Sequence, residues 1–104
     1  MPRFRLHRQV TVEFGEVIEW YASLSPLAAE NFAVCFLVAL DKVDRHPTAH
    51  APWQLPFRRV RVSRFPYLLI FHADRQMTSV LALVHQRREP QQIFETVARR
   101  RVEF

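Results

Sequence analysis

The hydrophobic and polar positions near the start of the chain follow two different periods. Residues 4–10 alternate apolar and polar side chains, which predicts a short edge strand with Phe4 and Leu6 facing inward. From Thr11 the apolar positions recur every three or four residues, which predicts an amphipathic helix over residues 11–23 with Thr11 as its N-cap. Gly15 lies inside this helix, and because a helical glycine costs stability, we expect another element to approach it closely.

A second helix follows almost at once. Ser25 can cap free amides and Pro26 is tolerated in a first helical turn, so a new helix begins there. Its apolar spacing continues to about Arg45, where a His-Pro step ends it. So short a connection predicts an antiparallel helical hairpin. Residues 47–57 contain three prolines and no clear period, which indicates an extended loop.

The second half of the chain has the pattern of a sheet. Alternating or continuous apolar runs predict three further strands, at residues 58–64, 67–71 and 77–84. The middle run is continuously apolar, as expected for a central strand covered on both faces. Helical spacing returns in residues 91–101 and predicts a short C-terminal helix. We therefore predict a single α+β domain over residues 1–104, ordered β-α-α-β-β-β, with the helical hairpin on one face of an antiparallel sheet.

Composition excludes several classes of function. The chain has 104 residues, 49% hydrophobic and 24% charged, which suits one folded domain. A single glycine excludes a Walker loop or a dinucleotide-binding fingerprint, because both need several. A single cysteine, Cys35, excludes a disulfide framework and a zinc site of several thiolates. We expect neither a metal nor another cofactor, and a soluble cytoplasmic protein without a signal peptide or a membrane-spanning segment.

The charge is concentrated in the second half of the chain. Residues 1–52 carry five basic and six acidic groups, whereas residues 53–104 carry ten basic and four acidic groups. Fourteen of the 15 cations are arginine, whose planar guanidinium binds carboxylate and phosphate through two parallel hydrogen bonds. The excess predicts an anionic partner that contacts the second half of the chain.

The order of short motifs in the second half resembles a known family. A basic strand is followed by a Phe-Pro-Tyr step, an apolar strand, a short turn and a strand that ends in His-x-Arg-Arg-x-Pro. The residues of this match are Phe65, Pro66, Tyr67, His85, Arg87, Arg88 and Pro90. The order resembles the ParE-like branch of the RelE/ParE toxin superfamily, and the two helices joined by a Ser-Pro step agree with it.

The resemblance implies the toxin of a type II toxin-antitoxin system, neutralised by a cognate antitoxin within a homodimer or a toxin-antitoxin hetero-oligomer. In the ParE branch the implied target is DNA gyrase, and the role is growth inhibition or plasmid stabilization. In the RelE branch the implied activity is ribosome-dependent cleavage of mRNA. The two branches share a fold, so the fold does not choose between them. A non-toxic, degenerate interaction module is a third alternative.

The residues favour binding over catalysis. RNA cleavage needs a proton acceptor, a stabiliser of the transition-state charge and a proton donor. The resemblance places Arg87 where RelE-like enzymes carry a catalytic arginine, with His85 or Arg61 as its partner. The matching position for their C-terminal tyrosine or histidine is Phe94, which has no proton to transfer. We therefore favour a gyrase inhibitor that is not itself an enzyme, and the nuclease stays an alternative.

Five arginines form the predicted binding site. They would converge on adjacent strands and bind an acidic target or the antitoxin, and they are Arg59, Arg61, Arg64, Arg87 and Arg88. Trp53 and Phe94 belong to a group of bulky residues, too many for the core, that would partly line an antitoxin groove; the others are Trp20, Tyr21, Phe57 and Ile93. The residues Phe65, Pro66, Tyr67 and Pro90 are interpreted as architecture. Cys35 is interpreted as a small core residue.

Overall fold

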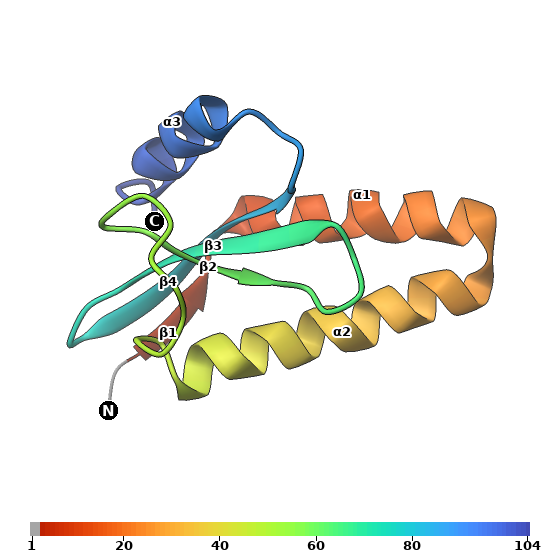
Figure 1. Cartoon of the computed structure of the whole chain (residues 1–104), viewed down its shortest axis with the longest axis horizontal. Helices are drawn as coiled ribbons and strands as arrows, with labels where there is room; N and C mark the ends of the chain where they lie inside the picture. Colours follow the sequence, from red (N-terminus) through yellow and green to blue (C-terminus); the bar gives the residue numbers. More distant parts are fainter. Residues whose placement is uncertain (1–2) are drawn as a thin grey trace.

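The computed structural model describes residues 3–104, which fold in the predicted order (Figure 1). Its elements are β1 (Arg3–Leu6), α1 (Arg8–Leu24), α2 (Pro26–Arg45), β2 (Arg58–Arg61), β3 (Tyr67–Ala73), β4 (Met77–His85) and α3 (Pro90–Arg100). The predicted α+β class, the helical hairpin and the C-terminal helix are confirmed. No helix among these is both long and apolar enough to cross a membrane.

The four strands form a mixed sheet in the order β1-β4-β3-β2. Strands β2, β3 and β4 are the predicted antiparallel meander. The prediction was wrong for β1, which runs parallel to β4, with Arg3 opposite Met77 and Leu6 opposite Val80. A parallel pair needs a long crossover, which the hairpin and two intervening strands provide here. Alternation of side chains reveals a strand but not its direction.

Helix α1 begins earlier than the pattern predicts. The strand ends at Leu6 instead of continuing to residue 10, and His7 is the N-cap instead of Thr11. The His7 Nδ1 atom accepts a hydrogen bond from the Gln9 amide at 3.1 Å. Val10 is fully buried on the helix, and its apolar side chain fits both the strand period and the helical period. The sequence pattern therefore placed the boundary between the strand and the helix too late in the chain.

Gly15 has open space around it. A Cβ atom built on this residue would meet nothing within 4 Å, so the expected close approach of another element is absent. The glycine serves no packing need that the structure shows.

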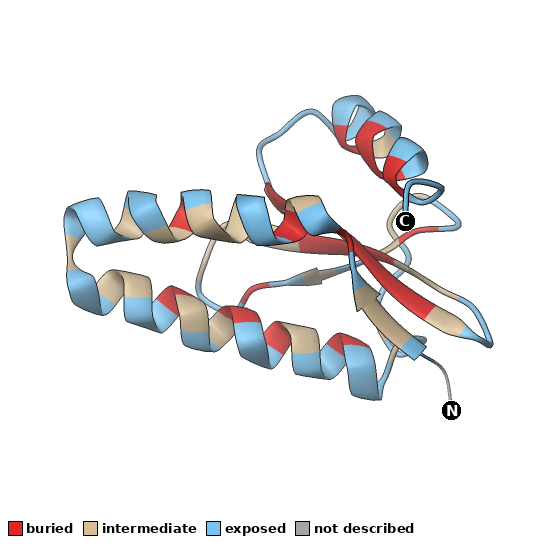
Figure 2. Cartoon of the chain, turned by 180° about the vertical axis from the view of Figure 1, so that it is seen from behind, coloured by how far each residue is buried: buried red, intermediate tan, exposed pale blue. Residues whose placement is uncertain are grey.

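Each face of the sheet has its own core (Figure 2). Helices α1 and α2 cover one face, where Phe32 and Phe36 pack against Leu69 and Phe71. Helix α3 covers part of the other, where Ile93 and Val97 pack with other buried residues, namely Phe57, Ile70, Leu81, Ala82 and Val84. Strands β3 and β4 are buried on both faces, as predicted for the continuously apolar run.

The Phe-Pro-Tyr step packs against the hairpin. The rings of Phe65 and Tyr67 meet the Phe32 ring at centroid distances of 5.1 and 5.5 Å, both edge to face. Phe65 also lies 5.1 Å from Tyr21 on α1. This aromatic cluster joins the β2–β3 connection to both helices, in keeping with an architectural role. The hairpin extends beyond the sheet at the end away from the N-terminus (Figure 1).

Candidate functional site

The sheet face that carries α3 is only partly covered, and the remainder is an open hollow of about 680 Å³. Strands β2 and β3, the loop before β2 and the turn after β4 form its walls. Its lining residues are His50, Ala51, Arg59, Val60, Arg61, Leu68, Gln86 and Arg87. We call it the arginine hollow, because Arg59, Arg61 and Arg87 supply its charge.

The strand period brings two of these arginines together. Arg59 lies opposite Ile70, and Arg61 lies opposite Leu68. Both partners belong to the core on the α3 face, so Arg59 and Arg61 share that face. Arg87 joins them from the turn after β4. The Arg61 Nε atom donates to the Phe65 carbonyl oxygen at 3.0 Å, which holds this side chain at the hollow. Cations converging on one concavity favour an anionic group there.

His50 is a residue of the hollow that sequence reasoning did not select. Its Nε2 atom lies 3.2 Å from the Lys42 carbonyl oxygen, and the Arg58 Nη1 atom donates to the His50 carbonyl oxygen at 2.8 Å. When Nε2 carries the proton that the Lys42 carbonyl accepts, the Nδ1 atom is an acceptor. The surrounding loop folds back on β2, with the Arg59 amide donating to the Ala51 carbonyl at 3.3 Å. No periodicity in residues 47–57 signals this folding.

Two of the five predicted arginines lie elsewhere. Arg64 borders a small hollow beside α2, together with Cys35 and Phe65. Arg88 borders a hollow on the helical side of the sheet, with Glu13 and Glu16. Strand β2 ends at Arg61 and the turn that follows reorients Arg64, while the turn after β4 separates Arg88 from Arg87. The convergence is therefore limited to Arg59, Arg61 and Arg87.

His85 lies apart from the arginine hollow. It belongs to the hollow that Arg88 borders, and its ring meets Tyr67 edge to face at 5.2 Å. Its Nδ1 atom accepts a hydrogen bond from the Arg87 amide at 3.0 Å, so it stabilises the turn after β4. The structure therefore separates His85 from the hollow of Arg87, whereas Arg61, the other predicted partner of Arg87 in the nuclease alternative, lies in the same hollow.

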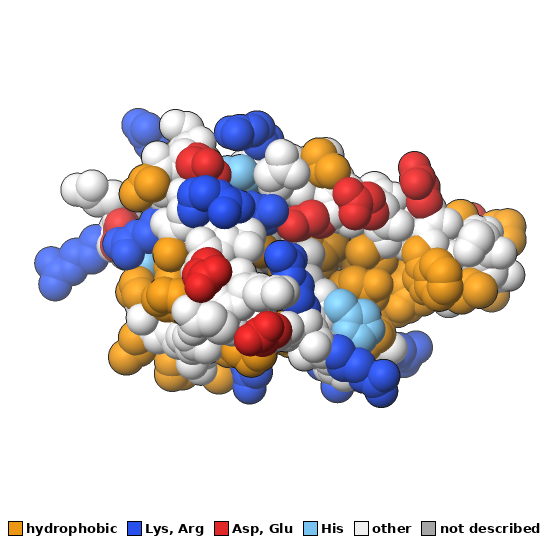
Figure 3. All heavy atoms as spheres, turned by 90° about the horizontal axis from the view of Figure 1, so that it is seen from above, with side chains coloured by type: hydrophobic (Ala, Val, Ile, Leu, Met, Phe, Trp, Pro, Cys, Tyr) orange, Lys and Arg blue, Asp and Glu red, His pale blue; other side chains and the backbone are white. Residues whose placement is uncertain are grey.

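Most of the bulky residues predicted to line an antitoxin groove pack inside the chain instead. Trp53 and Phe94 are half-buried and pack in the core on the α3 face, where the Phe94 ring lies 5.7 Å from Phe57. Phe57 and Ile93 are buried there too. Of the bulky residues expected at a groove, Trp20 is strongly exposed, at 59%. Figure 3 shows hydrophobic side chains gathered over the projecting end of the hairpin instead.

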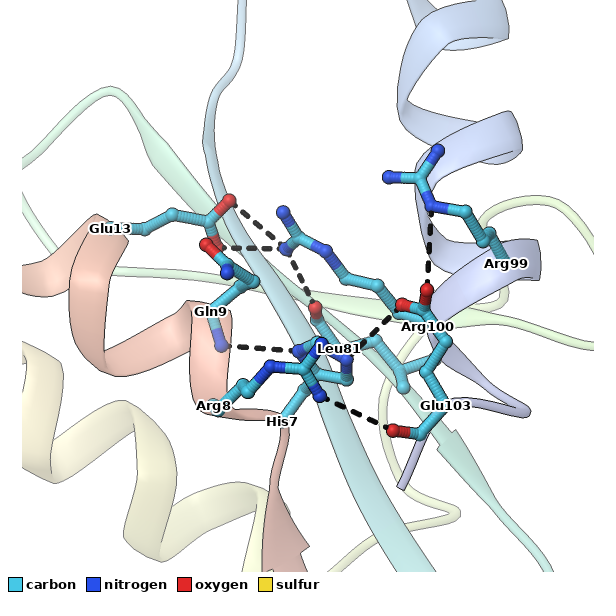
Figure 4. A network of polar contacts seen from close by, with 8 residues as sticks. All are labelled: His7, Arg8, Gln9, Glu13, Leu81, Arg99, Arg100 and Glu103. Atoms are coloured by element: carbon cyan, nitrogen blue, oxygen red, sulfur yellow. Dashed lines mark hydrogen bonds and ion pairs between the residues drawn. The ribbon is translucent and has the colours of Figure 1, made fainter.

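A buried ion pair fixes the position of α3 against α1 and β4 (Figure 4). The Arg100 Nη1 atom donates to both Glu13 carboxylate oxygens, at 3.1 and 3.0 Å, and to the Leu81 carbonyl oxygen at 3.0 Å. Glu13 also accepts a hydrogen bond from the Leu83 amide at 3.0 Å. Strand β1 ends at Leu6, so the backbone of β4 beyond Val80 has no strand neighbour on that edge. Glu13 and Arg100 form hydrogen bonds with that backbone instead.

The end of the described chain folds over His7 (Figure 4). The Arg8 Nη1 atom donates to the Glu103 carbonyl oxygen at 3.4 Å, and the His7 Nε2 atom lies 3.4 Å from the Glu103 carboxylate. The Phe104 ring meets His7 edge to face at 5.3 Å, with the Arg5 guanidinium 3.6 Å above it. These contacts attach the segment after α3 to the first turn of α1.

Comparison with known proteins places the fold. No protein-family model and no curated protein matches the chain. Among solved structures, the chain is similar to one described as "Chromosomal ParDE TA system from P. aeruginosa", with a TM-score of 0.72 and 16% sequence identity. The match covers 82% of this chain and 96% of that one. The chain has a ParE-like fold. The predicted RelE/ParE-like architecture is therefore confirmed.

Metal ligands do not gather in this ParE-like fold. Within residues 3–104, no group of three or more His, Cys, Asp or Glu side chains is arranged to hold a metal ion. The charged groups of the arginine hollow are guanidinium groups, whose usual partners are carboxylates and phosphates.

Proposed function

We propose that the chain is the toxin of a type II toxin-antitoxin system, that it binds DNA gyrase, and that a cognate antitoxin neutralises it. The observation that carries this proposal is the ParE-like fold, which matches nearly the full length of a chain in a ParDE system. The Phe-Pro-Tyr and His-x-Arg-Arg-x-Pro motifs agree with the fold and favour the ParE branch.

The arginine hollow supports action by binding. Arg59, Arg61 and Arg87 offer hydrogen-bond donors to carboxylates of a protein surface or to phosphates. Phe94 is half-buried against Phe57 and has no proton to transfer, and His85 lies in a different hollow. The chemistry of the hollow is thus that of an electrostatic contact, in keeping with a toxin that is not itself an enzyme.

A supercoiling assay tests the gyrase proposal. The purified chain, in stoichiometric excess over gyrase, should abolish supercoiling of relaxed plasmid. The variant Arg59→Gln/Arg61→Gln/Arg87→Gln should inhibit at least tenfold less well, since each lost charge-assisted contact is worth about 1.5 to 3 kcal/mol. The matched variant Arg75→Gln/Arg99→Gln removes exposed cations outside the hollow and should inhibit like the wild type. Unchanged supercoiling with the wild-type chain would contradict the proposal.

The antitoxin is tested separately. The product of the neighbouring reading frame should bind the purified chain and restore supercoiling. Growth arrest on induction of the chain alone, relieved by co-expression of that product, would support both parts together. A chain whose induction leaves growth unchanged would instead be the degenerate interaction module.

The second candidate is a ribosome-dependent mRNA endonuclease. The observation that favours it is the gathering of Arg61 and Arg87 in one hollow, because guanidinium groups can stabilise the charge of a transition state. Codon-specific cuts on translating ribosomes, abolished by Arg87→Ala and by Arg61→Gln, would favour this activity over gyrase binding.

A further inference from the structure

Arginines gather at the end of the molecule opposite the projecting hairpin (Figure 3). Three segments form this end, residues 3–8, 73–77 and 99–104, and we call them together the basic end. They carry two acidic residues, Asp74 and Glu103, against seven arginines, which are Arg3, Arg5, Arg8, Arg75, Arg99, Arg100 and Arg101. The segments are far apart in the sequence, so only the fold brings these charges together.

The turn between β3 and β4 lies beside the start of β1. The Arg3 amide donates a hydrogen bond to the Gln76 carbonyl oxygen at 2.8 Å, and Arg3 and Arg75 border one open hollow of about 540 Å³. Asp74 also borders it, but its carboxylate accepts hydrogen bonds from the Gln76 and Met77 amides, both at 2.8 Å. A phosphate that enters this hollow therefore meets two guanidinium groups.

The end of the described chain adds cations to the same place. The pKa of Asp74 is lowered chiefly by the two amide hydrogen bonds of the turn, and in smaller part by the charge of Arg101, which therefore lies near the turn. The Arg5 guanidinium stacks on the Phe104 ring at 3.6 Å, and its Nε atom donates to the Ser79 hydroxyl at 2.9 Å. Because these contacts hold Arg5 in place, it loses less freedom when it binds a ligand.

Much of this positive charge has no partner within the described chain. Arg3, Arg75 and Arg101 are exposed and take part in no ion pair among residues 3–104. Exposed cations from separate segments repel one another, and a polyanion that contacts several of them relieves that repulsion and releases its own counterions. Each guanidinium can also donate two parallel hydrogen bonds to one phosphate. The basic end therefore fits a polymer of regularly spaced phosphates.

The aromatic rings at the basic end are not placed to stack on bases. Proteins hold single-stranded nucleic acids largely by stacking bases on exposed aromatic rings. Phe104 is exposed, but one face of its ring is covered by Arg5 and the ring also meets His7 edge to face. Phe4 packs against the hairpin core. The contacts that remain are with phosphates, which a duplex presents along its outside.

We propose that the basic end binds the phosphate backbone of duplex DNA without reading its sequence. The choice of DNA over duplex RNA rests on the proposed function, because gyrase acts on DNA. The contact goes beyond that function, since it needs no gyrase and uses none of the three arginines of the arginine hollow. It would keep the free chain close to the DNA on which its target works.

Fluorescence anisotropy of labelled duplexes, with the purified chain and no gyrase, tests this contact. Two duplexes of about 20 base pairs and unrelated sequence should bind within twofold of each other, and more weakly as salt rises from about 50 to 200 mM. The variant Arg3→Gln/Arg75→Gln/Arg101→Gln should bind at least tenfold less tightly and lower the slope of log K against log salt by about 2 to 3. These side chains are exposed and unpaired among the described residues, so its Tm should match the wild type.

The variant Arg59→Gln/Arg61→Gln/Arg87→Gln is the matched control, because it loses the same charge from the arginine hollow. It should bind DNA within twofold of the wild type. Equal losses in the two triple variants would show that net charge alone governs binding and would overturn the basic end, as would a larger loss in the control. Duplex RNA bound tenfold more tightly than DNA would overturn the choice of DNA.

The two proposals fail separately. DNA binding that is lost only in the basic-end variant, by a chain that leaves supercoiling unchanged, would support the basic end and contradict the gyrase proposal. A chain that inhibits gyrase but binds neither duplex at about 50 mM salt would overturn the basic end and leave the gyrase proposal in place.

Discussion

His7 combines three roles at a single residue. It caps α1 through Nδ1, its ring is 1% exposed, and it packs against Phe104. Its Nε2 atom is the buried side-chain polar atom of the described chain that lacks a hydrogen-bond partner. Burial lowers the pKa of His7, the charges of Arg100 and Arg8 lower it further, and Glu103 opposes them. The neutral imidazole is therefore the form that suits the fold.

Stability should fall in mild acid because of this residue. The unfolded chain has an imidazole pKa of about 6.5, above that of folded His7, so protonation favours unfolding. The stabilising contribution is present above pH 6.5 and is lost as the pH falls through the folded pKa. Urea midpoints at pH 7.5 and 5.0 measure this loss. His7→Asn keeps a capping oxygen and should show a smaller loss.

His72 serves as the comparison for His7. Burial lowers the pKa of His72 as well, so His72→Gln should also reduce the acid sensitivity, and the two effects should add. If His7→Asn kept the full difference between the two midpoints, the account of His7 would be wrong.

Gly15 in helix α1 makes no close contact that would require a glycine. Because an added Cβ at Gly15 meets nothing within 4 Å, Gly15→Ala should gain the helix propensity of alanine without a clash, about 1 kcal/mol. Thermal unfolding should show a Tm higher by about 4 to 8 °C. Ala22→Gly, at an exposed position of the same helix, should lower the Tm by a similar amount. A lower Tm for Gly15→Ala would show that the glycine has a structural role.

Periodicity predicted the elements but not their junctions. The spacing of Phe14, Val17 and Tyr21 was enough to predict α1, because one face must be apolar to pack on a sheet. The start of α1 was missed because it depends on a hydrogen bond to His7, and histidine is an uncommon N-cap. The direction of β1 depends on long-range pairing with β4, which no local pattern contains.

The candidate site was predicted where it lies on strands and missed where it lies on turns. Period-two alternation placed Arg59 and Arg61 on one face, as observed. Arg64 leaves that face because its backbone is left-handed, a conformation that favours glycine and that no motif in the sequence signals there. His50 joins the hollow through a loop without periodicity.

The molecule as a whole is held together by a contact between distant parts of the chain. Glu13 on α1, Arg100 on α3 and the backbone of β4 meet at one point, where the two side chains are 15% and 10% exposed. This contact closes the unpaired edge of β4 and attaches α3 to the helical hairpin. Loss of this contact should therefore weaken the packing of α1, α3 and β4 together.

Removing one charge from this pair should be costly. Glu13→Gln leaves Arg100 with an uncompensated buried charge and should lower the free energy of unfolding by about 3 kcal/mol, measured in urea. The double variant Glu13→Gln/Arg100→Gln removes both charges and keeps groups that can bond to Leu83 and Leu81. It should lose less than the sum of the two single variants, which a double-mutant cycle measures. Strict additivity would argue against direct coupling.

The pairing of β1 with β4 also governs when the fold can form during synthesis. Residues 3–6 can pair only after residues 77–80 have been synthesised, and Glu13 can bind Arg100 only after that residue has been added. Neither contact therefore exists until nearly the whole chain has left the ribosome. The helical hairpin is complete long before, because its contacts are local. The arginine hollow, built from β2, β3 and the turn after β4, is among the last surfaces to take shape. A nascent chain therefore exposes its folded helical hairpin before the arginine hollow exists.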